Sequence, residues 1–257
     1  MPQILLRHML LLGVSVLLLA PPAPAQPVEL DSTLTTVDQQ REAGDFRTAL
    51  ATLNGLREEH PNDAGVLWRL SRTKVDLGEQ RTRDDERAQF YREALAHAET
   101  AIQADSTNAR THLAGAIAAG RVGLISGTRE KVQMSRAVKE YVDRAIELNP
   151  DLPAAYHVRA RWHYEVASLG FFSRTIVRAV YGGLPDASYE AAVENFERSI
   201  ALDDRVVDRL ELGRTYLAMD QEAEARAQLE TALTLPNKDP DDPQYKDEAR
   251  ELLDELS

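Results

Sequence analysis

Hydrophobic residues recur along most of this chain with the spacing of amphipathic helices, and proline and glycine separate the helical stretches. Residues 139–172 show the pattern most clearly. Asn149-Pro150 predicts the end of one helix, because proline disfavours the α conformation of the residue before it. A second helix is predicted to begin near Pro153. No stretch shows the alternation of a half-buried strand, so an all-α protein is predicted.

A repeat of about 34 residues organises these predicted helices. Each unit has small residues where its two helices would cross, and proline or glycine where the chain would turn. The clearest crossing residues are Ala49, Ala94, Ala160 and Gly213. A hairpin of this kind exposes one apolar face, which stacking buries. We therefore expect a tetratricopeptide-like α-α superhelix, a right-handed solenoid of about five helical hairpins, with a capping helix over 247–256.

Three segments depart from the regular repeat. Residues 79–87 add a charged stretch to the second unit, residues 123–127 form a glycine-flanked loop in the third, and residues 169–185 are an insertion in the fourth. The loop superficially resembles a phosphate-binding loop. Its glycine spacing is one residue short and no lysine follows the second glycine, so a turn is predicted.

The first 25 residues have the pattern of a secretory signal peptide. A weakly basic start precedes an apolar run over residues 9–20, and Ala23-Pro24-Ala25 permits cleavage before Gln26. The alternative is a membrane anchor, but the run is shorter than the ~20 residues that cross a bilayer. We expect an exported, periplasmic protein, with the signal peptide at 1–25 and the solenoid at 26–257, that is not integral to the membrane after cleavage.

Composition removes several classes of function. The chain has no cysteine, which excludes disulfides, thiolate metal sites and a lipidated cysteine. Its formal net charge is −12, and removal of the leader, whose only charged residue is Arg7, makes it more negative by one unit. Such a balance argues against binding to nucleic acid or to anionic membrane surfaces in general.

Residues that could carry out catalysis are sparse. His157 and His163 are six apart, which places them on different faces of one helix, and no metal-binding motif accompanies them. No serine has the G-x-S-x-G setting of a nucleophile elbow. We expect no catalytic residues, no metal and no cofactor, and hence a protein that is not an enzyme.

The predicted inner groove is more informative. In tetratricopeptide stacks the first helices of the hairpins line this groove, and the position just after the small residue of each first helix points into it. That position is occupied by Asp38, Arg72, Ile117, Arg161 and Arg214. Arg121 lies one turn further along the third unit, and Tyr164 lies one turn beyond Arg161.

Four arginines gathered in an acidic protein would repel one another unless anions balance them. They could bind an anionic ligand through bidentate contacts. Alternatively, neighbouring carboxylates could neutralise them, and Asp76, Glu165 and Glu211 are close enough in sequence to do so. The sequence is consistent with both explanations.

The insertion at 169–185 is the second candidate site. It combines the apolar residues Phe171, Phe172, Ile176 and Tyr181 with basic residues, so a short helix here would have a broad apolar face and a basic edge. The segment either folds back over its own core or exposes an apolar patch that docks a peptide or an acyl chain.

From about Glu86 onward the chain resembles a known family. The resemblance rests on residues 145–150, on Trp162-His163-Tyr164, on Phe172 and Arg174, on Tyr189, Glu190, Ala192 and Phe196, and on residues 212–217. These are similar to the regulator of microtubule dynamics family, whose core is a tetratricopeptide-like helical domain. The resemblance implies an interaction domain without catalysis, found beside membranes or the cytoskeleton. With a signal peptide, this chain would be an exported bacterial member that meets no microtubules.

Two functions follow as expectations. The first is a non-enzymatic scaffold that binds a partner protein or peptide, such as an anionic one, along a locally basic groove. The alternative is a carrier in which the groove arginines hold the phosphate head group of a phospholipid and the insertion shields its tails.

Overall fold

The computed structural model describes residues 27–256, apart from the side chains of Pro27, Val28, Phe171, Phe172, Arg174 and Ile176. Over this range the chain is helical and has no strand. The predicted signal peptide and its cleavage site at Ala25/Gln26 lie outside the described residues.

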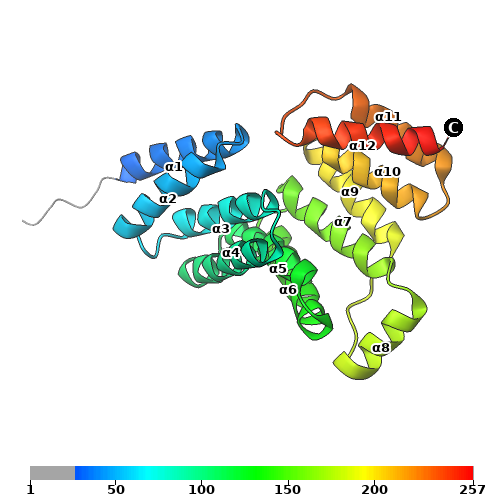
Figure 1. Cartoon of the computed structure of the whole chain (residues 1–257), viewed down its shortest axis with the longest axis horizontal. Coiled ribbons are helices and arrows are strands. Elements are labelled where there is room, and N and C mark those ends of the chain that lie inside the picture. Colours follow the sequence, from blue (N-terminus) through cyan, green and yellow to red (C-terminus); the bar gives the residue numbers. More distant parts are fainter. Residues whose placement is uncertain (1–26, 257) are drawn as a thin grey trace, which may run out of the picture.

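The helices form five antiparallel hairpins and a final helix, which confirms the predicted tetratricopeptide-like solenoid (Figure 1). The hairpins are α1 Pro27–Glu42 with α2 Phe46–Glu59, α3 Ala64–Glu79 with α4 Asp84–Ala104, α5 Ala109–Ile125 with α6 Thr128–Leu148, α7 Pro153–Ala167 with α9 Tyr189–Leu202, and α10 Val206–Leu217 with α11 Glu222–Thr234. The short helix α8 Phe171–Tyr181 occupies the insertion, and α12 Asp242–Glu255 follows the last hairpin.

Local sequence explains where several helices begin. The residue before the first turn is a short polar one whose side chain accepts a hydrogen bond from a backbone N–H that would otherwise lack a partner. The Asp63 carboxylate, for example, accepts from the N–H of Val66 at 2.8 Å. The side chains that cap helices in this way are Asp45 for α2, Asp63 for α3, Asn108 for α5 and Ser188 for α9.

Two predicted boundaries were wrong. Helix α5 continues to Ile125, so only Ser126 and Gly127 form the turn that was expected over residues 123–127. Gly123 lies inside α5 where this helix faces α6, and a Cβ on Gly123 would make an ordinary contact, at 3.4 Å, with Met134 Cβ. Helix α12 begins five residues earlier than 247, with Pro243 in its first turn, where proline is well tolerated.

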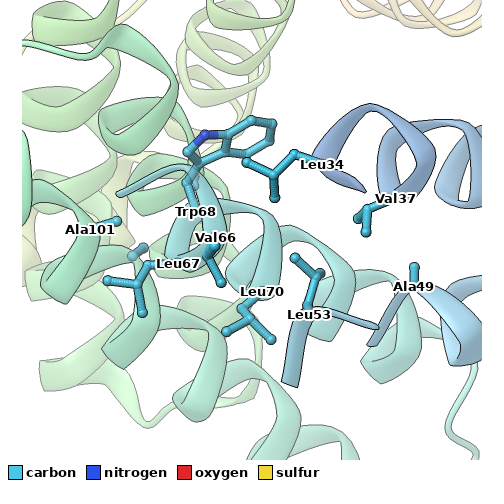
Figure 2. Close-up of a cluster of buried hydrophobic side chains, with 11 residues drawn as sticks. Leu34, Val37, Ala49, Leu53, Val66, Leu67, Trp68, Leu70 and Ala101 are labelled. Carbon is cyan, nitrogen blue, oxygen red and sulfur yellow. The ribbon is translucent and has the colours of Figure 1, made fainter. Parts of the chain in front are cut away.

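The hydrophobic core runs between the hairpins as a series of clusters. In the N-terminal cluster, Leu34 and Val37 of α1 pack with Leu53 of α2 and Leu70 of α3 (Figure 2). The crossing residues Ala49, Ala94 and Ala160 are fully buried, as expected for small residues that let helices approach closely. Gly213 is also buried and allows a still closer approach, since a Cβ at this position would lie 2.8 Å from Leu229 Cδ2.

The first helices of successive hairpins face each other and line the inner side of the solenoid. Helix α3 contacts α1 and α5, α7 contacts α5 and α10, and α10 contacts α12, whereas neighbouring second helices make no comparable contact in the described range. The array also curls back toward its start: the α1–α2 turn lies beside the loop before α12 (Figure 1), and a Cβ on Gly44 would be 3.5 Å from Pro240 Cγ. The inner face is therefore partly enclosed.

Candidate functional site

The predicted groove residues are distributed over the first helices as expected. Arg72 lies on α3, Arg121 on α5, Arg161 and Tyr164 on α7, and Arg214 on α10. They fall into two groups whose arginines have very different surroundings.

The C-terminal group is an ion-pair network. Arg161 donates to the Glu211 carboxylate at 2.7 Å and is 3.2 Å from Glu165. Arg214 donates to the same Glu211 oxygen at 3.0 Å and to Glu248 of α12 at 2.5 Å. Burial disfavours the charged form of Arg214, but its two carboxylate partners outweigh burial and raise the pKa. These two arginines are neutralised by their neighbours, and Glu248 is a partner that the sequence did not suggest.

The N-terminal group contains Arg41, Arg72 and Arg121, together with two acids on α3. Arg41 donates two hydrogen bonds to the Asp76 carboxylate, at 2.6 and 3.0 Å. Arg121 forms an ion pair with Glu79. The Arg72 guanidinium differs from both, because it has no hydrogen bond or ion pair with any described residue, and its Nε is buried. Burial, followed by the positive charges of Arg41 and Arg121, lowers its pKa to about 10.

Tyr164 packs against the second helix of its own hairpin. Its ring centroid lies 5.6 Å from that of Tyr189 at the start of α9, and it borders the cluster around Phe196. Burial raises the pKa of its hydroxyl. The structure therefore brings Tyr164 closer to the core than the groove prediction implied.

A hollow of about 380 Å³ opens between the N-terminal ends of α1, α3 and α5. We call it the Trp68 hollow; its lining is Leu30, Asp31, Leu34, Thr35, Asp63, Gly65, Trp68, Arg69, Asn108 and Arg110. The indole of Trp68 is only 7% exposed and faces Leu34 (Figure 2). The Arg69 guanidinium lies 4.1 Å from the indole centroid and is held by a bidentate pair with Asp38, at 2.7 and 2.8 Å.

The Trp68 hollow was not predicted from the sequence, although the sequence contains a signal for it. Trp68 is four residues before Arg72, so the two side chains share one face of α3. Gly65 is three residues before Trp68 on that face. A Cβ on Gly65 would lie 2.9 Å from Asp63 Oδ1 and 3.3 Å from Leu34 Cδ1, so glycine leaves the hollow open.

Helix α8 contacts α6 and projects from the solenoid at the bottom of the view in Figure 1. The Arg136 guanidinium of α6 donates to the carbonyl oxygens of Tyr181 and Gly183 and anchors the end of α8. Val177 is buried, whereas Val180 is 64% exposed. The side chains of the predicted residues Phe171, Phe172 and Ile176 lie outside the described set.

A second hollow, of about 560 Å³, lies between α6 and α8. Its lining is Arg129, Val132, Gln133, Arg136, Val180 and Tyr181. Whether the insertion folds back over its own core or exposes an apolar patch stays a prediction, because the side chains that would form the patch lie outside the described set.

The histidines considered for metal binding have other surroundings. His157 Nδ1 lies 2.8 Å from Asp208 Oδ1, while the His163 ring packs edge-on against Trp162, with centroids 5.0 Å apart. Within residues 27–256, as far as they are described, no group of three histidine, aspartate or glutamate side chains is placed to hold a metal ion. No helix in that part of the chain is long and apolar enough to cross a membrane.

The fold and its inner face define the class of protein as a tetratricopeptide-like helical solenoid. Among solved structures, TTC0263, a thermophilic TPR protein in Thermus thermophilus, superposes with a TM-score of 0.63 at 20% identity, covering 87% of this chain and 98% of that one. This similarity bears on the fold alone.

The chain belongs to the regulator of microtubule dynamics protein 1-3 family, which it matches over residues 33–257. Regulator of microtubule dynamics protein 1 from Bos taurus is 30% identical over 234 residues, covering 90% of this chain and 73% of the relative. Regulator of microtubule dynamics protein 3 from Xenopus laevis is 29% identical over 220 residues, covering 85% of this chain and 46% of that protein. The predicted family resemblance is confirmed.

Proposed function

We propose that this chain is a non-enzymatic scaffold that binds a partner protein or peptide along its inner face. The observation that carries the proposal is the Trp68 hollow, a concave site of about 380 Å³ built from three successive first helices. Such a site buries a side chain of a partner while the neighbouring first helices contact the rest of the segment. The unpaired Arg72 nearby makes this part of the inner face locally basic.

The microtubule activity in the relatives' names is not proposed for this chain. The apolar run and the A-x-A site of residues 1–25 support export to the periplasm, where no microtubules occur. Fractionation of cells that express the full chain tests this, with N-terminal sequencing of the mature protein. Export predicts a periplasmic product that begins at Gln26, and a cytoplasmic product with an intact leader would contradict it.

Site-specific photocrosslinking tests the scaffold proposal. A photoreactive amino acid at Thr35, an exposed residue on the lining of the hollow, should crosslink to a defined protein in the cells that produce the chain. The matched control is Glu99, which is exposed on the second helix α4. Equal crosslinking from the two positions, or none from Thr35, would contradict binding on the inner face.

A lipid carrier remains the second candidate because of the hollow between α6 and α8. Arg129 and Arg136 line it together with the exposed Val180, so a phosphate group and an acyl chain would both find complementary groups there. Native mass spectrometry of the purified protein should then show bound phospholipid that is lost in Val180→Asp. If the purified protein contains no lipid and takes up none from phospholipid vesicles, the lipid-carrier function is contradicted.

A further inference from the structure

Arg72 has no anionic partner among the described residues, although its guanidinium is largely removed from water. The guanidiniums of Arg41 and Arg121 act on Arg72 here, and so do the carboxylates of Asp76 and Glu79. The two acids are already bound by Arg41 and Arg121. Arg72 is therefore the one guanidinium of the three without a hydrogen bond or ion pair to a described residue. A charged group that is taken out of water is stable only when it is paired, so Arg72 is satisfied only by a further anion.

The surroundings also indicate how much negative charge this anion carries. One carboxylate would pair with the single positive charge of Arg72. A phosphate dianion would place a second negative charge beside Asp76 and Glu79, whose charges already act on Arg72. The second negative charge of the phosphate and the two carboxylates would repel each other, and this repulsion is stronger in a partly buried site than in water. The arrangement therefore favours a single carboxylate over a phosphate.

The Trp68 hollow lies one helical turn from Arg72 on the same face of α3. Its walls present the guanidiniums of Arg69 and Arg110, with Arg110 5.6 Å from the Trp68 ring centroid and exposed. An aliphatic side chain would displace water from these cations without replacing its interactions. An aromatic ring would interact with both through its π face, and a hollow of about 380 Å³ has room for one ring.

The spacing of the two sites matches an extended peptide. Arg72 is four positions after Trp68 in α3, which corresponds to about 6 Å along the helix axis. In an extended segment, side chains two residues apart point the same way and are separated by about 6.6 Å. An aromatic residue and an acidic residue two positions apart would therefore reach both sites together.

We propose that the Trp68 hollow and Arg72 form a two-part subsite for an extended partner segment that carries an aromatic residue and an aspartate or glutamate two positions away. The subsite rests on the proposed peptide-binding function and specifies its ligand. Arg72 supplies the charge recognition, and the hollow supplies the shape.

The first experiment needs no ligand. Arg72→Met retains most of the side-chain volume and removes the unpaired charge, so its melting temperature should equal or exceed that of the wild-type protein. Arg47→Met is the matched control, since Arg47 is exposed on α2 and also makes no ion pair with a described residue. A clear drop in the melting temperature of Arg72→Met alone would show that Arg72 is already compensated, and would overturn the proposal.

The second experiment selects ligands from a phage-displayed library of random dodecapeptides, with the wild-type protein, Arg72→Met and Arg47→Met as targets. Wild type and Arg47→Met should enrich an aromatic residue two positions from an acid. Arg72→Met should retain the aromatic preference and lose the acidic one. In the best synthetic peptide, replacing the acid by its amide should weaken binding to wild type about tenfold or more and leave binding to Arg72→Met unchanged.

The outcomes separate this inference from the proposed function. Inner-face crosslinks at Thr35, combined with selected peptides that contain no acid, would overturn the subsite and leave the scaffold standing. If no peptide is enriched and Thr35 gives no crosslink, both the subsite and the proposed scaffold function are contradicted. Tighter binding of a phosphoserine peptide than of the acidic one would overturn the assignment to a single carboxylate. Arg72-dependent binding to phosphatidic acid vesicles without any peptide selection would assign the site to lipid instead.

Discussion

The packing of the last hairpin depends on the absence of a side chain at Gly213. The Cβ of Gly213→Ala would lie 2.8 Å from Leu229 Cδ2 and 2.9 Å from Leu229 Cγ, closer than carbon atoms approach without repulsion. Leu229 is fully buried and cannot move toward solvent. Replacement by alanine should therefore destabilise the protein, even though alanine favours a helix more than glycine does.

The expected size follows from two opposing effects. Alanine in place of glycine inside a helix stabilises by about 0.5–1 kcal/mol. Overpacking a close contact in a core destabilises by about 1–3 kcal/mol. The net loss at Gly213 should be about 1 kcal/mol, which lowers the melting temperature by about 2–4 °C in a chain of this length. Gly213→Leu should lose more.

Gly55 provides the matched control. It lies inside α2, and a Cβ there would meet nothing within 4 Å, so Gly55→Ala should stabilise the protein by about 0.5–1 kcal/mol. Thermal and urea unfolding followed by circular dichroism and tryptophan fluorescence would measure both variants, and agreement of the two signals would show that the transition is cooperative.

A double mutant isolates the contact itself. In a Leu229→Ala background the atoms that clash with residue 213 are gone, so Gly213→Ala should no longer destabilise. If Gly213→Ala raised stability as much as Gly55→Ala in the wild-type background, the close approach of α10 and α11 would be refuted.

Three further predictions concern charge and the insertion. Asp76→Asn should lower the free energy of unfolding by about 2 kcal/mol, since it leaves Arg41 unpaired in a partly buried site, whereas Asp85→Asn, at a pair that is two-thirds exposed, should change it by less than about 0.5 kcal/mol; equal effects in urea unfolding would contradict this. Burial lowers the pKa of His97 from 6.5 to about 4, so the unfolded chain takes up this proton first, and the stabilisation present above pH 6.5 is lost as the pH falls toward 4. Between pH 6.5 and 4 the melting temperature of His97→Gln should therefore fall less than that of the wild-type protein. Parallel plots of melting temperature against pH would argue against a buried neutral imidazole. Arg136→Ala should speed hydrogen exchange within α8 and leave exchange within α10 unchanged, because it removes the hydrogen bonds that anchor the end of α8. If α8 exchanged at the same rate in Arg136→Ala and in the wild-type protein, this anchoring role would be contradicted.

The sequence by itself determined the repeat, the all-α class and the family. These depend on local patterns, such as the small residues Ala49, Ala94 and Ala160, the helix end at Asn149-Pro150, and apolar residues at helical intervals. Such patterns involve residues close together in the chain, so they can be recognised without the tertiary structure. The positions of Arg72, Arg161 and Arg214 on first helices followed from the same register.

Only the tertiary structure decided which of those arginines have partners. The Arg41–Asp76 and Arg214–Glu248 pairs each join residues 34 or 35 positions apart, and their existence depends on how neighbouring units rotate against each other. That rotation is set by packing, as at Gly213, and no local pattern encodes it. The Trp68 hollow is also assembled from three helices. The sequence thus supplied four candidate cations, and the stacking of the units left Arg72 without a carboxylate partner among the described residues.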